Sequence, residues 1–218
     1  MAINYYINGV NFTTDGIYVS DSKGIVGGLK LRRPVTQEWP DYHGEVVDMA
    51  APRYEARDIT LECFMKATTK ENFLSGMQTF MARWMTGTMK RLMIVVDAAK
   101  PLVYDLYLTM GPDVDKKWND STMVGTFSLK LREPEPVKRV YSFIAAAGAL
   151  SVSVTVTSIK AVTIYWGDGS VSYDIVTGSG AQVHAYASAG TYYISIAGVI
   201  EDVTGVTTGA TLVWSKLL

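Results

Sequence analysis

The stretch VTIYWGDGSVSYDI, Val162–Ile175, joins two alternating runs through a turn in which two glycines flank an aspartate. Alternation of apolar and polar residues over a short run is typical of a β-strand with one buried face. Glycine supplies the backbone angles that a tight turn needs, and Asp168 can accept hydrogen bonds from its own turn. The stretch therefore predicts two adjacent strands. It also raises the question of whether Trp166–Ser170 forms a functional site or only a turn.

The composition indicates a protein with a packed core and no strong charge. Of 218 residues, 48% are hydrophobic and 19% are charged, and the formal net charge is −1. A near-neutral chain carries no electrostatic footprint for nucleic acid or acidic lipid. The single cysteine, Cys63, cannot form an internal disulfide, so we expect packing alone to hold the fold. The N-terminus has no leader pattern, and no apolar run is long enough for a membrane helix, so we expect synthesis in the cytoplasm without membrane insertion.

Charged residues are unevenly distributed along the chain. Residues 141–218 contain only two of the 20 basic and four of the 21 acidic residues. The change coincides with LREPEPVKRVYSF, residues 131–143, where Pro134 and Pro136 interrupt any regular strand. We therefore predict two domains, residues 1–139 and 140–218, with the boundary near Arg139.

The first half is predicted to be mostly β. Its predicted strands are ARDITLECFMKA (56–67), KRLMIVVDA (90–98), LVYDLYLTM (102–110) and MVGTFSLKLRE (123–133). The polar run GPDVDKKWNDST (111–122) separates the last two and predicts a hairpin with a long tip.

One helix is predicted over TTKENFLSGMQTFMARWMTG, residues 68–87. Thr68 and Glu71 have the spacing of a capping box, and Gly87 can take the left-handed position that ends a helix. The apolar residues recur at helical spacing and predict a face that packs on a sheet. They are Phe73, Leu74, Met77, Phe80, Met81, Trp84 and Met85.

The segment from Leu31 to Tyr54 contains Pro34, Pro40 and Pro52, so it cannot be a central strand for long. An arm that reaches another chain and a solvated loop are equally consistent with this pattern. The assembly candidates are Trp39, Tyr42, His43, Arg53 and Tyr54 in this segment, and Asp113, Asp115, Lys116 and Lys117 in the hairpin tip.

Motifs for catalysis or metal binding are missing from the sequence. The two histidines, His43 and His184, lie in different halves, and neither has a second ligand at metal-binding spacing. No phosphate-binding glycine loop and no nucleophile elbow occurs. We therefore expect no enzyme, no cofactor and no bound metal.

The second half resembles the polycystic-kidney-disease (PKD) repeat, an immunoglobulin-like β-sandwich. The WGDGS turn is followed by SGAQVHAYASAGTYYISIAG, residues 179–198, in the order typical of that family. The matching residues are Trp166, Gly167, Asp168, Gly169, Ser170, His184, Tyr186, Gly190, Thr191, Tyr192, Ile194 and Ile196. The resemblance implies that Trp166, Gly167, Asp168, Gly169, His184, Tyr186 and Gly190 form a structural turn and core rather than a catalytic site.

The first half resembles the N-terminal domain of phage distal tail proteins and their tail-tube relatives. The resemblance rests on WPDYHGEVVDMAAPRYEARDITLECFMKA (39–67), the helix, the strands near 89–97 and 101–108, and VGTFSLKLREPEP (124–136). It implies a β-sandwich with one flanking α-helix that assembles into a hexameric ring around the DNA channel. A distal tail protein often continues into a galectin-like domain, whereas a PKD-like domain follows here.

The sequence as a whole therefore predicts a mainly β structural protein of a phage or prophage tail, located in the virion. We expect a distal tail protein in a homo-hexameric ring between the tail tube and the tip or baseplate, with DNA only passing through. A tail-tube protein with an outer immunoglobulin-like domain is one alternative. A monomeric two-domain module that binds a cell-surface polysaccharide or protein is another.

Overall fold

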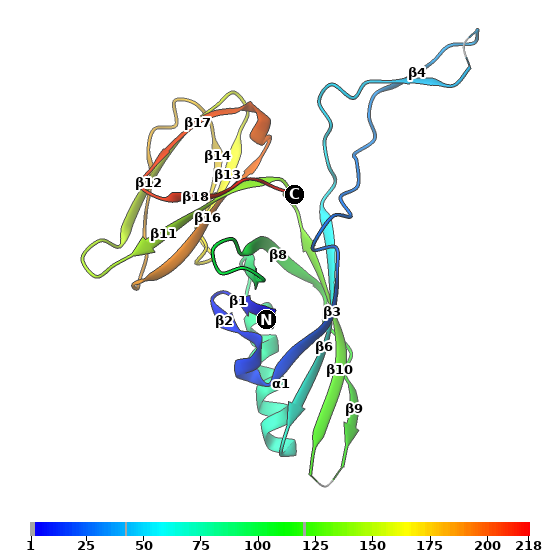
Figure 1. Cartoon of the computed structure of the whole chain (residues 1–218), viewed down its shortest axis with the longest axis vertical. Coiled ribbons are helices and arrows are strands. Elements are labelled where there is room, and N and C mark those ends of the chain that lie inside the picture. The colour runs from blue at the N-terminus through cyan, green and yellow to red at the C-terminus, as the bar shows by residue number, and fades with distance from the viewer. Residues whose placement is uncertain (1–2, 42, 120) are drawn as a thin grey trace.

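The computed structural model describes residues 3–41, 43–119 and 121–218 and has a mainly β fold with a single α-helix among those residues (Figure 1). The predicted fold class is confirmed in this respect. The first part of the chain forms β1 (Asn4–Ile7), β2 (Val10–Asn11), the 3-10 helix η1 (Phe12–Asp15), β3 (Ile17–Lys23), β6 (Arg57–Ala67), α1 (Lys70–Trp84), β7 (Lys90–Val95), β8 (Leu102–Met110), β9 (Asp115–Trp118) and β10 (Met123–Glu133).

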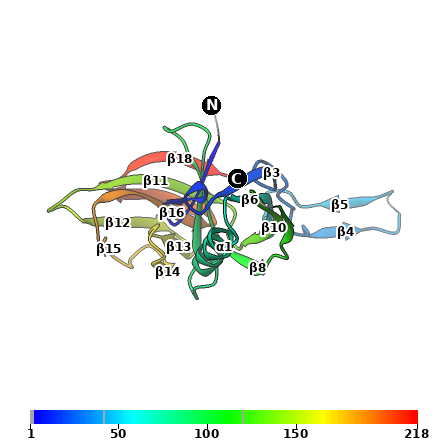
Figure 2. The same cartoon turned by 90° about the horizontal axis from the view of Figure 1, so that it is seen from below.

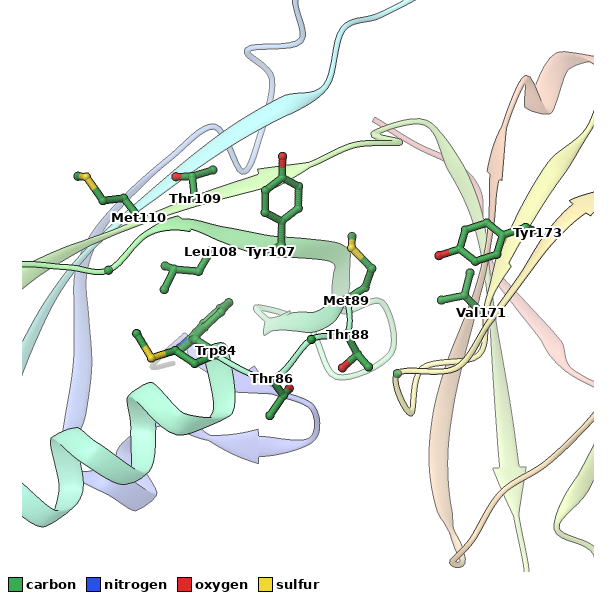
Figure 3. A pocket seen from close by; sticks show the side chains of 14 residues that line it. Trp84, Thr86, Thr88, Met89, Tyr107, Leu108, Thr109, Met110, Val171 and Tyr173 are labelled. Atoms are coloured by element: carbon green, nitrogen blue, oxygen red, sulfur yellow. The ribbon is translucent and has the colours of Figure 1, made fainter.

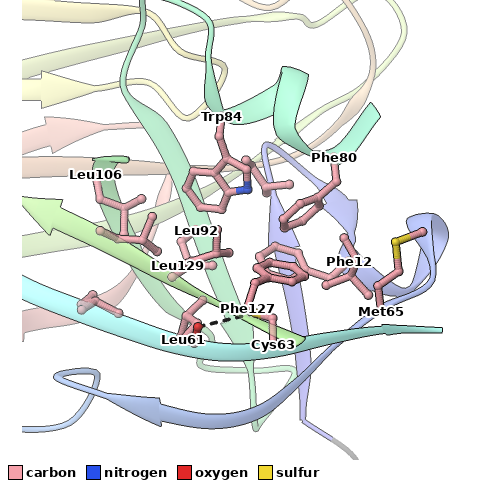
Figure 4. Close-up of a cluster of buried hydrophobic side chains, with 14 of the residues drawn as sticks. Phe12, Leu61, Cys63, Met65, Phe80, Trp84, Leu92, Leu106, Phe127 and Leu129 are labelled. Carbon is pink, nitrogen blue, oxygen red and sulfur yellow. Dashed lines mark hydrogen bonds between the residues drawn. The ribbon is translucent and has the colours of Figure 1, made fainter. Parts of the chain in front are cut away.

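These strands make one sheet in the order β2-β1-β7-β8-β10-β6-β3, and β9 pairs with the other end of β10. The sheet curls so that β1, near one end, approaches β3 at the other. The Tyr5 hydroxyl in β1 donates a hydrogen bond to Ser22 Oγ in β3 at 3.4 Å. Strand β6 alternates as predicted, and its buried positions Ile59, Leu61 and Cys63 face a core shared with the other strands (Figure 4).

Helix α1 covers this core with aromatic side chains. Phe80 and Trp84 are buried, and Phe80 meets Phe12 edge-on at 5.0 Å between ring centroids. Such edge-to-face pairs add to the free energy gained by burial. Two positions of the predicted apolar face are wrong, since Leu74 and Met85 are exposed.

The ends of α1 also differ from the prediction. The helix is capped by Thr69, whose hydroxyl accepts a hydrogen bond from the Asn72 N–H at 3.1 Å. The predicted capping residue Thr68 is therefore one position too early. Met85 ends the helix, and Gly87 lies beyond it without a left-handed backbone.

The second part of the chain is a two-layer β structure. It contains β11 (Lys138–Ala145), β12 (Ser151–Ser158), β13 (Val162–Tyr165), β14 (Val171–Ile175), β15 (Gln182–Ala185), β16 (Gly190–Gly198), the 3-10 helix η2 (Ile200–Asp202), β17 (Val203–Thr208) and β18 (Thr211–Leu217). One sheet has the order β14-β13-β16-β11-β18, and the other has the order β15-β12-β17. Val154 of the smaller sheet and Ile164 and Ile194 of the larger sheet belong to one buried cluster, so the two sheets pack face to face.

The segment between β3 and β6 projects away from both layers (Figures 1 and 2). It contains a short hairpin of β4 (Thr36–Glu38) and β5 (Glu45–Val47), which we call the arm hairpin. The sequence predicted an extended segment here but no strand pairing. A two-stranded hairpin without a covering layer is marginally stable in water, so the arm hairpin lacks the burial that holds the other strands.

The connection between the two parts is exposed only at its start, at Pro134, and is buried where it enters the second part. Pro136, Val137 and Lys138 are buried, and Arg139 already belongs to β11. Among the described residues, no strand up to β10 pairs with a strand from β11 onward. The domain boundary near Arg139 stays a prediction, but its surroundings are packed.

A buried carboxylate anchors this connection. Glu133 lies 3.5 Å from Arg57 Nε and also accepts a hydrogen bond from Lys138 Nζ. Both cations lie near the ring of Tyr104, with the Arg57 guanidinium carbon at 5.2 Å and Lys138 Nζ at 5.3 Å from its centroid. Three charges from β6, β10 and β11 therefore share one water-poor site.

Further polar contacts join the two parts. Arg91 in β7 pairs with Asp105 at 2.7 Å and donates hydrogen bonds to the carbonyls of Tyr193 and Tyr165. The Trp214 indole N–H donates to the carbonyl of Pro101 at 2.8 Å. These contacts fix β13, β16 and β18 against the first sheet.

We predict that Glu133→Gln lowers the free energy of unfolding by about 3–5 kcal/mol, because it leaves two buried cations without a counter-charge. Urea unfolding of the whole chain measures this loss. The matched control is Arg132→Ala, which removes an exposed pair with Asp58 and should cost about 0–1 kcal/mol. Equal losses in the two variants would contradict the role assigned to Glu133.

Candidate assembly surfaces

The WGDGS stretch forms a packed turn between β13 and β14. The Trp166 N–H donates to the Ser170 carbonyl at 3.1 Å, and the Ser170 N–H donates to Asp168 Oδ1 at 2.9 Å. The buried indole of Trp166 stacks on His184 at 4.9 Å between ring centroids. The Tyr186 hydroxyl donates to the Trp166 carbonyl at 2.8 Å. The turn is therefore tied to β15 and to the chain that follows it.

Asp168 accepts a hydrogen bond within this turn and pairs with His184, whose Nε2 lies 2.7 Å from Asp168 Oδ2. Burial alone would raise the pKa of Asp168, but the hydrogen bonds from Ser170 and His184 hold it below its usual value. Gly190, the last residue predicted for this core, opens β16 opposite Ala145. In the described residues, no group of three His, Cys, Asp or Glu side chains is placed to hold a metal ion.

The predicted arm residues fall into two groups. Trp39 and His43 are exposed beyond the two strands of the arm hairpin, whereas Tyr42 lies outside the described residues. Arg53 and Tyr54 lie at the base of the arm, where the Arg53 carbonyl accepts a hydrogen bond from the Arg32 N–H at 2.7 Å. The exposed apolar side chains of the arm are Val35, Trp39, Val46, Val47 and Met49.

The predicted hairpin tip contains strand β9. Asp115, Lys116 and Lys117 are exposed on β9, and exposed Asp113 precedes it. Lys116 Nζ lies 5.6 Å from the centroid of the Trp118 ring, close enough for a cation–π contact. Strand β9 pairs with β10 on one side and with no described strand on the other.

Strands β9, β10, β6 and β3 form a four-stranded segment with two free edges. Each pair in it is antiparallel, so strand direction alternates across the segment. Its inner face carries the core, and its outer face is mostly polar apart from the stacked rings of Tyr18 and Phe64. On that outer face Arg132 pairs with Asp58 at 3.1 Å, and Ser128 donates a hydrogen bond to Glu62.

A groove of about 770 Å³ lies between the end of α1, β8 and β14 (Figure 3). Both parts of the chain line it, and several of its apolar side chains are exposed. Its lining includes Met85, Thr86, Thr88, Tyr107, Met110 and Tyr173. The sequence did not predict this groove, because its walls come from residues far apart in the chain.

No protein-family model and no curated protein matches the chain. Several solved structures do match. The Dit protein of phage SPP1, described as a paradigm of the hub adsorption apparatus in phages that infect Gram-positive bacteria, is 13% identical, with a TM-score of 0.44 over 88% of this chain and 79% of that one. A chain of the phage p2 baseplate in its activated conformation is 8% identical over 90% of this chain and 98% of that one, with TM-scores of 0.49 in the strontium form and 0.48 in the calcium form.

These structural neighbours are phage hub and baseplate proteins. Their identities and TM-scores are too low to assign a function to this chain. A function therefore has to be argued from the surfaces of the chain itself. In the part of the chain that the structure describes, no helix has the length and hydropathy needed to cross a bilayer.

Sequence reasoning missed the buried charges at the connection and Lys90 beside the groove. The runs KRLMIVVDA and LREPEPVKRV do place charges inside predicted strands, and a charged residue at a strand position that should be buried signals a buried ion pair. The spacing does not reveal the partners, because each pair joins separate strands.

The two glycines of the WGDGS turn should respond differently to alanine. Both have a left-handed backbone, with φ of +95° at Gly167 and +97° at Gly169. A Cβ at Gly167 would lie 2.7 Å from the Tyr193 carbonyl oxygen, whereas the nearest atom to a Cβ at Gly169 is Thr88 Oγ1 at 3.8 Å. We predict that Gly169→Ala costs about 1–2 kcal/mol and that Gly167→Ala costs distinctly more. Urea unfolding of both variants tests this, and equal losses would contradict it.

Proposed function

We propose that this chain is a structural protein of a phage tail that joins copies of itself edge to edge into a ring. The observation that supports this most directly is the four-stranded segment, which has a free edge at β3 and another at β9. Unpaired strand edges present rows of N–H and C=O groups that another chain can pair with. Repeated contacts of one edge with the other are heterologous, and such contacts close into a ring when the rotation allows.

The strand directions favour this arrangement. Within the segment the strands alternate in direction, and β9 and β3 run opposite ways because three antiparallel pairs separate them. When the β3 edge of one copy meets the β9 edge of the next, the new pair is therefore also antiparallel. The sheet can continue from copy to copy with one hydrogen-bonding pattern.

In such a ring the polar face of the segment lines the channel, because α1 and the core cover the other face. The charges on this face are mixed. They include Asp58, Glu62 and Asp115 among the acids, and Lys66, Lys117 and Arg132 among the bases. A lining of mixed charge suits a channel that passes DNA without holding it by its phosphates.

The finer assignment rests on the sequence resemblance. It favours a hexameric distal tail ring between the tube and the tip or baseplate, with the second part of the chain as a PKD-like domain on the outside. A tail-tube protein with the same outer domain would use the same edges. In both cases we propose the virion tail as the location, other tail proteins as partners, and no catalysis.

Cysteine pairs on the two edges test the ring. Asp21 opposes Glu62 and Lys117 opposes Val124 on the outer face, so cysteines at both positions of β3 and β9 can meet only between copies. We expect Asp21→Cys/Lys117→Cys, or the neighbouring registers Tyr18→Cys and Asp115→Cys, to form a ladder of disulfide-linked oligomers on oxidation that ends at the hexamer. Native Cys63 does not interfere, because it is buried and burial raises its pKa to about 12.

The control pair Asp21→Cys/Lys100→Cys keeps two exposed thiols but places one away from the β9 edge. It should give no disulfide-linked ladder under the same oxidation. A chain that gives no ladder in any register, and that sediments as a monomer even with other tail components present, would instead be a monomeric binding module.

A further inference from the structure

The arm hairpin is acidic. Residues 34–52 contain four acidic residues and no lysine or arginine. Glu38 of β4 lies directly opposite Glu45 of β5, and both are exposed. Like charges at opposed positions of a strand pair destabilise it. The hairpin between the arginines at its base, Arg32, Arg33 and Arg53, is therefore acidic, and it exposes apolar side chains that a partner surface can cover.

The groove at the end of α1 offers the opposite charge. Lys90 is 1% exposed, and its ammonium group donates hydrogen bonds to the hydroxyls of Thr86 and Thr88, the latter at 2.9 Å. Both threonines line the groove. Within the described residues, Lys90 forms no ion pair with a carboxylate. A buried cation without a counter-ion is costly, and its burial lowers its pKa.

The groove also offers an apolar surface. Met85 is 69% and Met110 57% exposed, and Tyr173 lines the same groove from the second part of the chain. Methionine adapts its shape to irregular partners, and tyrosine combines a flat apolar ring with a hydroxyl donor. The lining thus combines apolar side chains, hydroxyl donors and one adjacent cation, which suits an acidic segment with apolar side chains.

We propose that the groove between α1, β8 and β14 receives the arm hairpin of a second copy of this chain, with an arm carboxylate at the Thr86 and Thr88 hydroxyls that Lys90 supports from behind. This inference rests on the proposed assembly, and it adds the surface to which the arm binds. The arm projects away from the body of its own chain (Figures 1 and 2), so it does not occupy the groove of that chain. The acidic side chains of the arm complement the positive charge beside the groove, and its apolar side chains complement the apolar lining of the groove.

A peptide tests this without requiring a ring. A head-to-tail cyclised, fluorescein-labelled peptide of residues 34–52 is titrated with the whole chain, and binding is read as fluorescence anisotropy. We expect binding to the wild-type chain that weakens at least about tenfold for Lys90→Met, which removes the charge but keeps an apolar stem. A peptide with Glu38→Gln and Glu45→Gln should bind weakly to the wild-type chain and lose little more with Lys90→Met.

Met110→Glu is a second variant, because this exposed side chain can change without disturbing the core and would repel an acidic arm. The matched control is Lys100→Met, which removes an exposed lysine outside the groove. No binding to the wild-type chain, or equal binding to all variants, would overturn the inference. Because the disulfide ladder between β3 and β9 reports on the ring separately, failure of the arm site and failure of the ring can be told apart.

Discussion

The carboxylate of Glu133 is the point on which the architecture depends, because segments that would otherwise move independently meet there. Arg57 begins β6, the strand on which the chain returns from the arm, and Lys138 begins β11, the first strand of the second part. Arg57 also donates to the Ile25 carbonyl at 3.2 Å, and the Tyr104 hydroxyl donates to the same carbonyl at 2.8 Å. The chain leaves toward the arm just after Ile25. One buried carboxylate therefore fixes where the arm starts, where it returns and where the second part begins.

A charged cluster at this place is better explained by geometry than by stability. A buried ion pair is often no more stabilising than apolar residues of the same volume, because removing charges from water is costly. Apolar side chains can slide past one another, whereas a carboxylate between two cations accepts only a few arrangements. We interpret the Glu133 cluster as fixing the directions in which the arm and the second part of the chain leave this site. In the proposed assembly the arm and the second part of the chain would meet neighbouring copies, and a fixed direction would then matter more than additional stability.

The sequence predicted the parts of the fold that local patterns determine. Strand β6 alternates for its whole length, and α1 shows helical spacing, so both were found within a few residues of their ends. The pairing of Arg57 with Glu133 and the contact of Arg91 with the Tyr193 carbonyl could not be predicted from sequence. They join residues that only the folded structure brings together. The arm hairpin was missed for another reason. Its strands have three residues each and no buried face, so the sequence shows no apolar–polar alternation from which they could be predicted.

The position of the groove gives the proposed assembly a property that pairing of strand edges alone lacks. Hydrogen bonds between β3 of one copy and β9 of the next would join the first parts of neighbouring chains. They would not hold the second part, residues 140–218, in place. The groove has walls from both parts of the chain, since Thr86 and Thr88 belong to the first part and Tyr173 to the second. An arm bound there would hold both parts of a neighbour together. The internal contact of Arg91 with the Tyr193 carbonyl already fixes that orientation within one chain, so the groove is formed before the arm arrives. Binding to a surface formed in advance loses little conformational entropy, and this allows a short, marginally stable hairpin to act as a connector between copies.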